Sequence, residues 1–262
     1  MDLGIRGKRA LVAGGSAGMG KACANALALA GVEIVISARS RDRLEATAAE
    51  ISAATGSLVT PVVADHGTEE GRSALLNACP EPDILVITCS PPRSVRSHLE
   101  ISPAEWRAVF ETTFIGPVEL MRATVDGMVE RRFGRIVNIG TVGAKRPIAE
   151  RVLSGAPRAA LANFSVALAQ QVARHNVAIN SILPGLFHTE GSLKRYGELA
   201  SANGRTYEEE TRSRVRELNV PAQRFGDPAD IGAACALLCS AHSSFTIGQS
   251  LTIDGGQHLS LF

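Results

Sequence analysis

The chain lacks any strong excess of charge and has few aromatic residues. Among its 262 residues, 27 Lys and Arg face 26 Asp and Glu, and aromatic residues make up 4%. A net charge of +1 offers no broad basic surface to a phosphate backbone, so we expect no nucleic-acid partner. The five cysteines are odd in number and contain no C-x-x-C pair, which argues against a disulfide framework or a metal site. Reduced thiols in a cytoplasm fit this pattern best.

Long apolar runs are also missing. No segment approaches about eighteen uninterrupted apolar residues, and the first nine residues have no apolar signal-peptide region. We therefore expect neither a membrane span nor a signal peptide, and a cytoplasmic location.

What the sequence does have is a regular alternation of β-branched runs with longer Ala- and Leu-rich stretches. This alternation is typical of repeated βαβ units and predicts an α/β fold, a single Rossmann-type domain over residues 1–262 with helices on both faces of a doubly wound parallel sheet. About seven strands are predicted, at Arg9–Ala13, Glu33–Ala38, Leu58–Ala64, Ile84–Thr88, Gly134–Ile139, Ala178–Leu183 and Ser250–Ile253.

The segment 186–220 stands apart because it is polar and charged. Gly191, Gly197 and Gly204 are possible breaks within it. It follows the sixth predicted strand at its carboxyl end, where ligands of such sheets bind. We expect a substrate lid here, the alternative being an ordinary surface insertion.

A glycine-rich turn follows the first predicted strand and leads into an Ala-rich helix. Such a turn presents backbone N–H groups and a positive helix end to a pyrophosphate, whereas the alternative is a bare turn. The residues that we assign to cofactor binding here are Gly14, Ser16, Gly18, Met19 and Gly20.

The end of the second strand has a base where an acid would bind a ribose 2′-hydroxyl. Arg39 and Ser40 lie there, and the guanidinium can bind a 2′-phosphate, so we expect NADP(H) in preference to NAD(H). A solvated arginine is the alternative. Asp65, after the third strand, suits an adenine amino group or could cap the helix that begins near Thr68.

These motifs resemble the classical short-chain dehydrogenase/reductase family over essentially the whole chain. Asp65 matches that family's adenine-binding Asp. Cys89 lies in the segment matching its Asn-Asn-Ala-Gly stretch. Pro184 and Gly185, with Thr189, resemble the stretch that holds the nicotinamide carboxamide.

The resemblance fails at the family's catalytic tetrad, where all four positions are substituted. Thr113 stands in the position of the Asn and Thr141 in that of the Ser, while Ser154 and Arg158 replace the Tyr and Lys of Tyr-x-x-x-Lys. An atypical subgroup of the family resembles this Ser-x-x-x-Arg arrangement.

The altered residues predict weaker proton chemistry rather than none. Ser154 is a far weaker acid than tyrosine and could equally be a helix N-cap. Arg158 stays charged and can stabilise an alkoxide but cannot relay a proton by titrating. Thr141 keeps a hydroxyl for a substrate carbonyl. His188 is a candidate proton donor, although a lone loop histidine is more often a bystander. Tyr196 and Glu150 are weaker candidates.

The expected function is an NADP(H)-dependent oxidoreductase that interconverts a small-molecule ketone and a secondary alcohol with a non-standard proton-delivery group. The alternatives are a catalytically degraded dinucleotide-binding regulatory or assembly protein, and a non-redox lyase or isomerase. The resemblance also implies a homodimer or homotetramer formed through helices near 103–130 and 155–175. In the second of these, Leu161, Phe164, Leu168 and Val172 form an apolar stripe that faces either a partner or the sheet.

Overall fold

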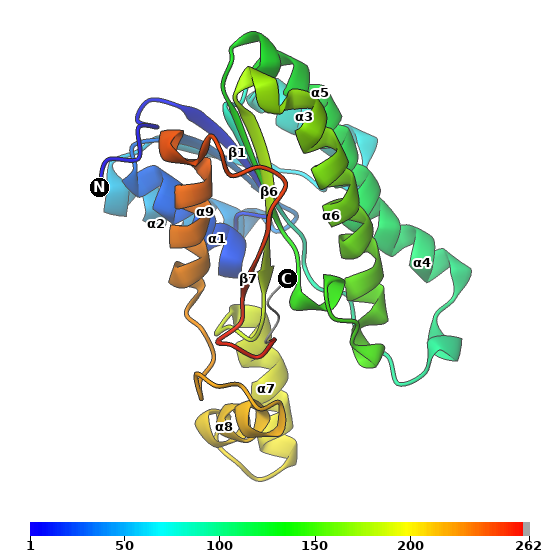
Figure 1. The fold of residues 1–262 in the computed structure, drawn as a ribbon. Helices are drawn as coiled ribbons and strands as arrows, with labels where there is room; N and C mark the ends of the chain where they lie inside the picture. Colours follow the sequence, from blue (N-terminus) through cyan, green and yellow to red (C-terminus); the bar gives the residue numbers. More distant parts are fainter. Residues whose placement is uncertain (259–262) are drawn as a thin grey trace.

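The computed structural model describes residues 1–258, and its centre is one parallel sheet of seven strands. The strand order is β3-β2-β1-β4-β5-β6-β7 (Figure 1). The strands are β1 (Arg9–Ala13), β2 (Glu33–Ala38), β3 (Val59–Val63), β4 (Ile84–Thr88), β5 (Gly134–Ile139), β6 (Val177–Pro184) and β7 (Ser250–Ile253). The predicted doubly wound sheet is confirmed. Strands β1 to β3 are added toward one edge of the sheet and β4 to β7 toward the other, so the strand order switches between β1 and β4. Ligands of such folds bind beside this switch point.

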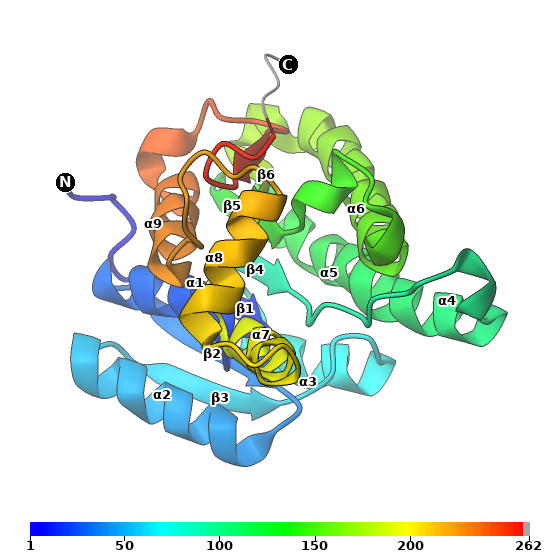
Figure 2. The same cartoon turned by 90° about the horizontal axis from the view of Figure 1, so that it is seen from below.

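Helices cover both faces of the sheet. Those of the described residues are α1 (Gly18–Leu29), α2 (Arg41–Thr55), α3 (Glu69–Ala78), α4 (Pro103–Phe110), α5 (Gly116–Glu130), α6 (Val152–Val172), α7 (Glu190–Ala202), α8 (Tyr207–Glu217) and α9 (Pro228–Cys239). One face carries α1, α2 and α9, and the other carries α3, α5 and α6 (Figure 2).

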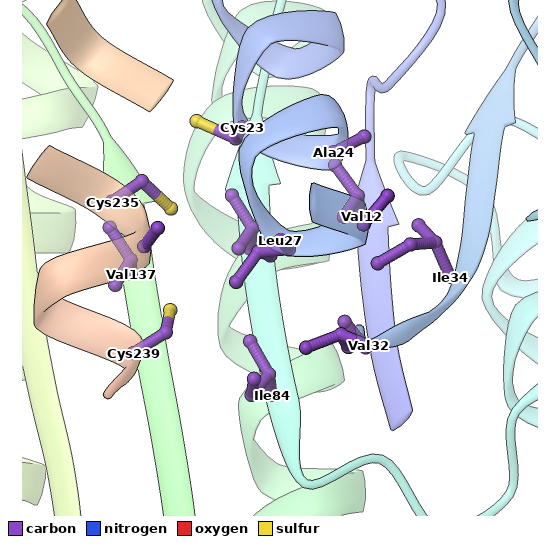
Figure 3. Close-up of a cluster of buried hydrophobic side chains, with 14 of the residues drawn as sticks. Val12, Cys23, Ala24, Leu27, Val32, Ile34, Ile84, Val137, Cys235 and Cys239 are labelled. Atoms are coloured by element: carbon purple, nitrogen blue, oxygen red, sulfur yellow. The ribbon is translucent and has the colours of Figure 1, made fainter. Parts of the chain in front are cut away.

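Three of the five cysteines lie in the core between the sheet and helices α1 and α9. Cys23 of α1 and Cys235 and Cys239 of α9 lie among Leu27 and the aliphatic residues of the central strands (Figure 3). All five cysteines are free thiols, and four of them are buried. Hydrogen bonding with Cys23 and Cys239, together with burial, raises the pKa of the Cys235 thiol well above its ordinary value. These thiols therefore act as small packing groups.

Helix α6 is apolar enough to draw attention. With its flanking turns, Ala149–His175 has the length and composition of a membrane-spanning helix. In this structure it packs on β6 and α5. Leu161 and Val172 belong to the buried core of that face, and Phe164 and Leu168 pack against it. Leu161 and Val172 of the apolar stripe therefore face the core, while Phe164 and Leu168 stay partly exposed.

The segment 186–220, called here the α7–α8 arm, projects from the carboxyl end of the sheet (Figure 1, yellow). Its two helices begin at reciprocal caps, Thr189 with Ser192 and Thr206 with Glu209. These caps stabilise the polar helices. Gly191 and Gly197 consequently lie inside α7, where we expected breaks. Gly204 lies between the two helices, as predicted.

Candidate active site

The glycine-rich turn between β1 and α1 has the geometry of a phosphate cradle. A Cβ on Gly20 would collide with the Gly14 carbonyl, and Gly18 has a left-handed φ of +51°. Both positions thus require glycine. The N-cap residue of α1, Ala17, gives no side-chain hydrogen bond, so the first N–H groups of this helix have no local cap. These residues fit the pyrophosphate of a dinucleotide.

The start of α7 reaches this turn from the far end of the chain. The Glu190 carboxylate accepts a hydrogen bond of 2.8 Å from the Gly18 N–H. An ideal Cβ on Gly18 would lie 3.3 Å from the Thr189 methyl carbon, so the two residues are close neighbours. Thr189 itself caps α7, because its Oγ1 accepts from the Ser192 N–H at 3.2 Å. The structure thus brings Gly18 and Thr189 together and adds Glu190, which the motif analysis missed.

The residues expected around the adenosine lie together at the ends of β2 and β3. Arg39 is 73% exposed and only loosely paired, with 3.9 Å between its Nη1 and Asp65 Oδ2. Its guanidinium is therefore available to a 2′-phosphate. Asp65 does not cap α3, since Thr68 accepts from the Gly71 N–H in that role. Asp65 instead accepts from the Gly67 N–H at 2.9 Å. Ser40 is the N-cap residue of α2 but makes no side-chain cap bond.

Pro184 and Gly185 end β6 beside the last strand. The Gly185 N–H donates to the Ile253 carbonyl at 2.9 Å, and a Cβ on Gly185 would lie within 2.6 Å of the Asp254 Cβ. Asp254 also stabilises the turn after β7. Its carboxylate accepts hydrogen bonds from the Gly256 and His258 N–H groups and pairs with the His258 ring. This arrangement fixes the path of the chain from β6 into the α7–α8 arm.

Ser154 and Arg158 are buried and directly bonded to each other. Arg158 Nη1 donates to Ser154 Oγ at 3.0 Å and to the Ser154 carbonyl at 3.2 Å. Its Nη2 donates to the Cys89 carbonyl at 3.1 Å. Burial lowers the pKa of Arg158, but arginine titrates so far above neutral pH that the guanidinium stays charged. The site therefore holds a fixed, desolvated cation.

Ser154 is not the N-cap of its helix, contrary to one of the sequence interpretations. Helix α6 begins at Val152 with Arg151 as the N-cap residue, so Ser154 is the third residue of the helix. Pro157 also lies beyond the first turn, inside the helix. Proline has no N–H, so the Leu153 carbonyl loses its helical donor. The hydroxyl of Ser154 is bonded to Arg158 instead of a helix-end N–H.

Thr141 lies in a short turn that packs on the start of α6. Its Oγ1 accepts from the Gly143 N–H at 3.3 Å, which leaves its own proton free to donate. An ideal Cβ on Gly155 would lie 2.7 Å from the Gly143 carbonyl, and this close approach sets the turn of Thr141 against the residue after Ser154. The structure thus places Thr141 beside the Ser154–Arg158 pair.

Thr113 is buried in a π-helical turn, Glu111–Ile115, which joins α4 and α5. Turns of this kind are frequent at functional sites. The carbonyl of its neighbour Thr112 accepts from Cys89 Sγ at 3.3 Å and is 3.0 Å from His66 Nε2. Burial raises the pKa of the Cys89 thiol to about 11. Cys89 thus offers its backbone carbonyl to Arg158, while its sulfur stays protonated.

His188 is exposed and lies inside the α7–α8 arm, between the end of β6 and the start of α7. Its Nδ1 shares a hydrogen bond of 2.8 Å with the Tyr207 hydroxyl, and its ring lies 5.2 Å from that of Phe225. Within residues 1–258, no hydrogen bond joins this ring to Thr141, Ser154 or Arg158. The contact instead fastens α8 to the end of β6.

The chain is similar to known reductases over nearly its whole length. The family model described as enoyl-(acyl carrier protein) reductase matches residues 13–258. An uncharacterized oxidoreductase, YvaG of Bacillus subtilis, is 32% identical over the full length of both chains. The 3-oxoacyl-[acyl-carrier-protein] reductase FabG of Aquifex aeolicus is 27% identical, over 98% of this chain and 99% of that protein.

The solved structures include one of very similar shape. L-sorbose reductase from Gluconobacter frateurii, complexed with NADPH and L-sorbose, superposes with a TM-score of 0.95 at 32% identity, and the match covers 100% of each chain. The family model and these relatives extend over the cradle, the Ser154–Arg158 pair and the α7–α8 arm alike. This protein belongs to the short-chain dehydrogenase/reductase family of oxidoreductases.

Proposed function

We propose that this protein is an NADP(H)-dependent oxidoreductase that interconverts a ketone and a secondary alcohol without the Tyr–Lys pair usual in its family. The observation that carries the proposal is the nucleotide cradle at Gly14–Gly20, which lies at the same sheet edge as the Thr141, Ser154 and Arg158 cluster. The similarity to an L-sorbose reductase that was solved with NADPH and L-sorbose supports both the cofactor and the class of reaction.

The chain's residues divide the binding of the cofactor between them. The Gly18 and Gly20 backbone would hold the pyrophosphate, Arg39 the 2′-phosphate and Asp65 the adenine amino group. Pro184 and Thr189 would hold the carboxamide. When bound, the reduced nicotinamide supplies the hydride that reaches the carbonyl carbon.

The proton chemistry falls to Thr141, Ser154 and Arg158. Thr141 donates its free hydroxyl proton as a hydrogen bond to the substrate oxygen, and the Arg158 cation stabilises the negative charge that develops there. Ser154 Oγ accepts from Arg158, so its own proton points elsewhere and can pass to the alkoxide, with water restoring it. Because serine is a weak acid, we expect proton transfer to limit the rate. We assign the chain on this basis to an atypical Ser-x-x-x-Arg subgroup.

A second candidate is a dinucleotide-binding protein that has lost catalysis. This candidate is favoured by the hydrogen bonds of Arg158, because the guanidinium already donates to three oxygens of the protein. His188 remains a candidate proton donor, and its Nδ1 is free for that role only when the hydrogen bond to the Tyr207 hydroxyl breaks.

The α7–α8 arm is proposed to act as the substrate lid of a single-domain protein. Its contact with the cradle through Glu190 supports this role, because closure of the arm and occupancy of the cradle then involve the same atoms. We also propose a cytoplasmic homodimer or homotetramer. In the apolar stripe of α6, Phe164 and Leu168 are partly exposed and available to that assembly, whereas Leu161 and Val172 pack in the core.

The first test is a fluorescence titration with NADPH and NADH in parallel, followed by a panel of ketones and secondary alcohols. Saturable binding with NADPH favoured, and turnover of at least one carbonyl, is the expected result. Tight NADPH binding without turnover would favour the second candidate. No binding of either nucleotide would refute both.

A further inference from the structure

His66 is a buried histidine that takes no part in the proposed chemistry. It lies between β3 and α3, next to Asp65, and is 7% exposed. Its Nε2 is 3.0 Å from the Thr112 carbonyl oxygen and 3.3 Å from Cys89 Sγ. Burial lowers the pKa of His66 below its ordinary value, so the ring is neutral at neutral pH. Because a carbonyl oxygen only accepts, the single ring proton lies on Nε2 and is donated to Thr112.

The Thr112 carbonyl lacks the two donors that a helix normally provides. It lies in the π-helical turn between α4 and α5, where the N–H groups four and five residues later would be its partners. The Gly116 N–H donates to the Glu111 carbonyl instead, and Pro117 has no N–H. An unpaired carbonyl inside a protein is costly, so His66 supplies the hydrogen bond that the helix cannot.

The backbone around His66 packs closely on the same turn. A Cβ on Gly116, at the start of α5, would collide with the His66 carbonyl, and a Cβ on Gly67 would lie 2.9 Å from Thr112 Oγ1. The His66 carbonyl also accepts from Arg72 Nη1 of α3 at 3.1 Å. His66 is thus held through both its ring and its backbone.

Cys89 connects this contact to the Ser154–Arg158 pair. Its Sγ donates to the same Thr112 carbonyl at 3.3 Å, while its own carbonyl accepts from Arg158 Nη2 at 3.1 Å. Within residues 1–258, this is the only hydrogen bond that the Arg158 side chain makes outside α6. The position of Cys89 therefore determines where the far side of the guanidinium lies.

We propose that His66 is a positioning residue for the reduction of the ketone. By donating to the Thr112 carbonyl it fixes the π-helical turn and the Cys89 thiol beside it, and so places the carbonyl to which Arg158 donates. This inference rests on the proposed function and adds to it a residue that acts on the cation through two others. The loop of His66 also carries Asp65, so the adenosine end of the cofactor and the reacting end share one support.

Two polar variants separate positioning from packing. The amide nitrogen of His66→Gln reaches about as far as Nε2 and can still donate to the Thr112 carbonyl, whereas the shorter amide of His66→Asn cannot. We expect His66→Asn to lower kcat by about 10-fold or more, because a displaced Arg158 stabilises the alkoxide less. KM for NADPH should change little, and His66→Gln should keep most of the wild-type kcat. NADPH oxidation with ethyl acetoacetate and with L-sorbose gives both constants.

Two control variants isolate the effect. His98→Asn makes the same exchange at an exposed histidine and should leave kcat unchanged. Ile179→Val removes a buried methyl group from the core on the α6 face of the sheet, so it lowers the melting temperature without touching the site. Circular dichroism shows that each variant is folded. If Ile179→Val lowers kcat as much as His66→Asn does, loss of stability explains the effect and the inference is wrong.

Two further measurements do not depend on turnover. Nitrogen NMR of the wild-type histidine rings should show His66 neutral, with a slowly exchanging proton on Nε2. Phenylglyoxal treatment of the nucleotide-free protein, read by peptide mass spectrometry, should modify Arg158 slowly in the wild type and in His66→Gln. In His66→Asn the same modification should be several-fold faster, because the guanidinium is held less firmly.

Failure of this inference differs from failure of the proposed function. If the wild type reduces neither ketone, the proposed function is wrong for those ketones, and the NMR and phenylglyoxal results decide the inference by themselves. If the wild type does reduce one and His66→Asn keeps its kcat, the positioning role is wrong. Equal modification of Arg158 in His66→Asn and the wild type would also overturn it. Should His66→Asn not fold, the wild-type NMR result still decides, because a proton on Nδ1 leaves Nε2 nothing to donate to Thr112.

Discussion

The two halves of the site differ in what they are made of. The cradle beside β1 and β2 is built from backbone N–H groups and from glycines that no other residue can replace. The cluster beside β4, β5 and β6 is built from side chains: Arg158 is bonded to Ser154 and to the Cys89 carbonyl, and Thr141 lies in the turn that packs on the start of their helix. The backbone half keeps the family's pattern, whereas each side chain of the other half has changed. The comparison indicates that nucleotide binding and proton delivery vary independently on this scaffold.

The largest effect should come from filling the cradle. In Gly20→Val the new side chain would collide with the Gly14 carbonyl, which is backbone and has no room to yield. We expect NADPH affinity to fall by about 100-fold or more, since the turn must distort to bind. Fluorescence titration measures this. Gly197→Ala on α7 is the control, because a Cβ there meets open space. Unchanged binding in Gly20→Val would remove the case for the cradle.

Removing the Arg158 cation should impair the side-chain half of the site and leave the nucleotide cradle intact. Arg158→Met leaves the Ser154 oxygens and the Cys89 carbonyl without their donor, so we expect a loss of about 2 kcal/mol in the free energy of unfolding. Turnover at saturating substrate should fall about 100-fold, because the charge on the alkoxide is no longer stabilised. Denaturant unfolding and single-turnover kinetics measure the two effects.

The control for this change is Arg122→Met, which removes only an exposed ion pair with Glu119. It should alter stability by at most about 0.5 kcal/mol. If Arg158→Met loses stability but keeps the wild-type turnover rate, the cation holds the fold and has no part in the chemistry.

A smaller and more selective effect is expected at Arg39. Arg39→Ala should weaken NADPH binding by about 10- to 100-fold and leave NADH binding nearly unchanged, because only NADPH carries the 2′-phosphate. Parallel titrations measure the ratio. Arg41→Ala, which removes an exposed pair with Glu45, is the matched control. An equal loss of affinity for both nucleotides would show that Arg39 does not bind the 2′-phosphate.

The smallest effect concerns the hydrogen bond that joins Glu190 of the arm to Gly18 of the cradle. In Glu190→Gln the side chain keeps its shape but loses the negative charge beside the Gly18 N–H, where the pyrophosphate would lie. We expect NADPH to bind a few-fold more tightly, about the effect of one charge at a helix N-terminus. Glu198→Gln, on the same helix and exposed, should bind as the wild type does. Weaker binding in Glu190→Gln would mean that the carboxylate supports the nucleotide instead of competing with it.

The sequence predicts the sheet well because its signals are local. Each strand is a short β-branched run bounded by turn residues, so the predicted limits differ from the observed ones by no more than a residue, as at β3 and β6. Polar segments are harder, because a cap decides whether they become helical. The Thr189 and Thr206 caps keep the arm helical through Gly191 and Gly197, which the glycine pattern indicated as breaks.

The site shows the limit of that reasoning. Spacing places Ser154 and Arg158 one helical turn apart, and the structure confirms that they are in contact. The start of α6 was predicted three residues too late, since nothing local identifies Arg151 as an N-cap residue. The Glu190 contact with Gly18 joins residues 172 positions apart, and the Arg158 bond to the Cys89 carbonyl joins residues 69 positions apart. Such pairs depend on how the sheet brings distant ends together, which no local pattern encodes.

The bond between Arg158 and Ser154 also constrains how this sequence can change. Restoring the usual pair would require Ser154→Tyr and Arg158→Lys. Each substitution alone is unfavourable. A lysine at position 158 cannot bond both Ser154 and the Cys89 carbonyl as the guanidinium does. A tyrosine at position 154 must fit where the residue is only 3% exposed. Because the two residues are coupled, each single intermediate is expected to be less stable than either end state. Descendants of this protein should therefore retain the serine and the arginine together or exchange both at once.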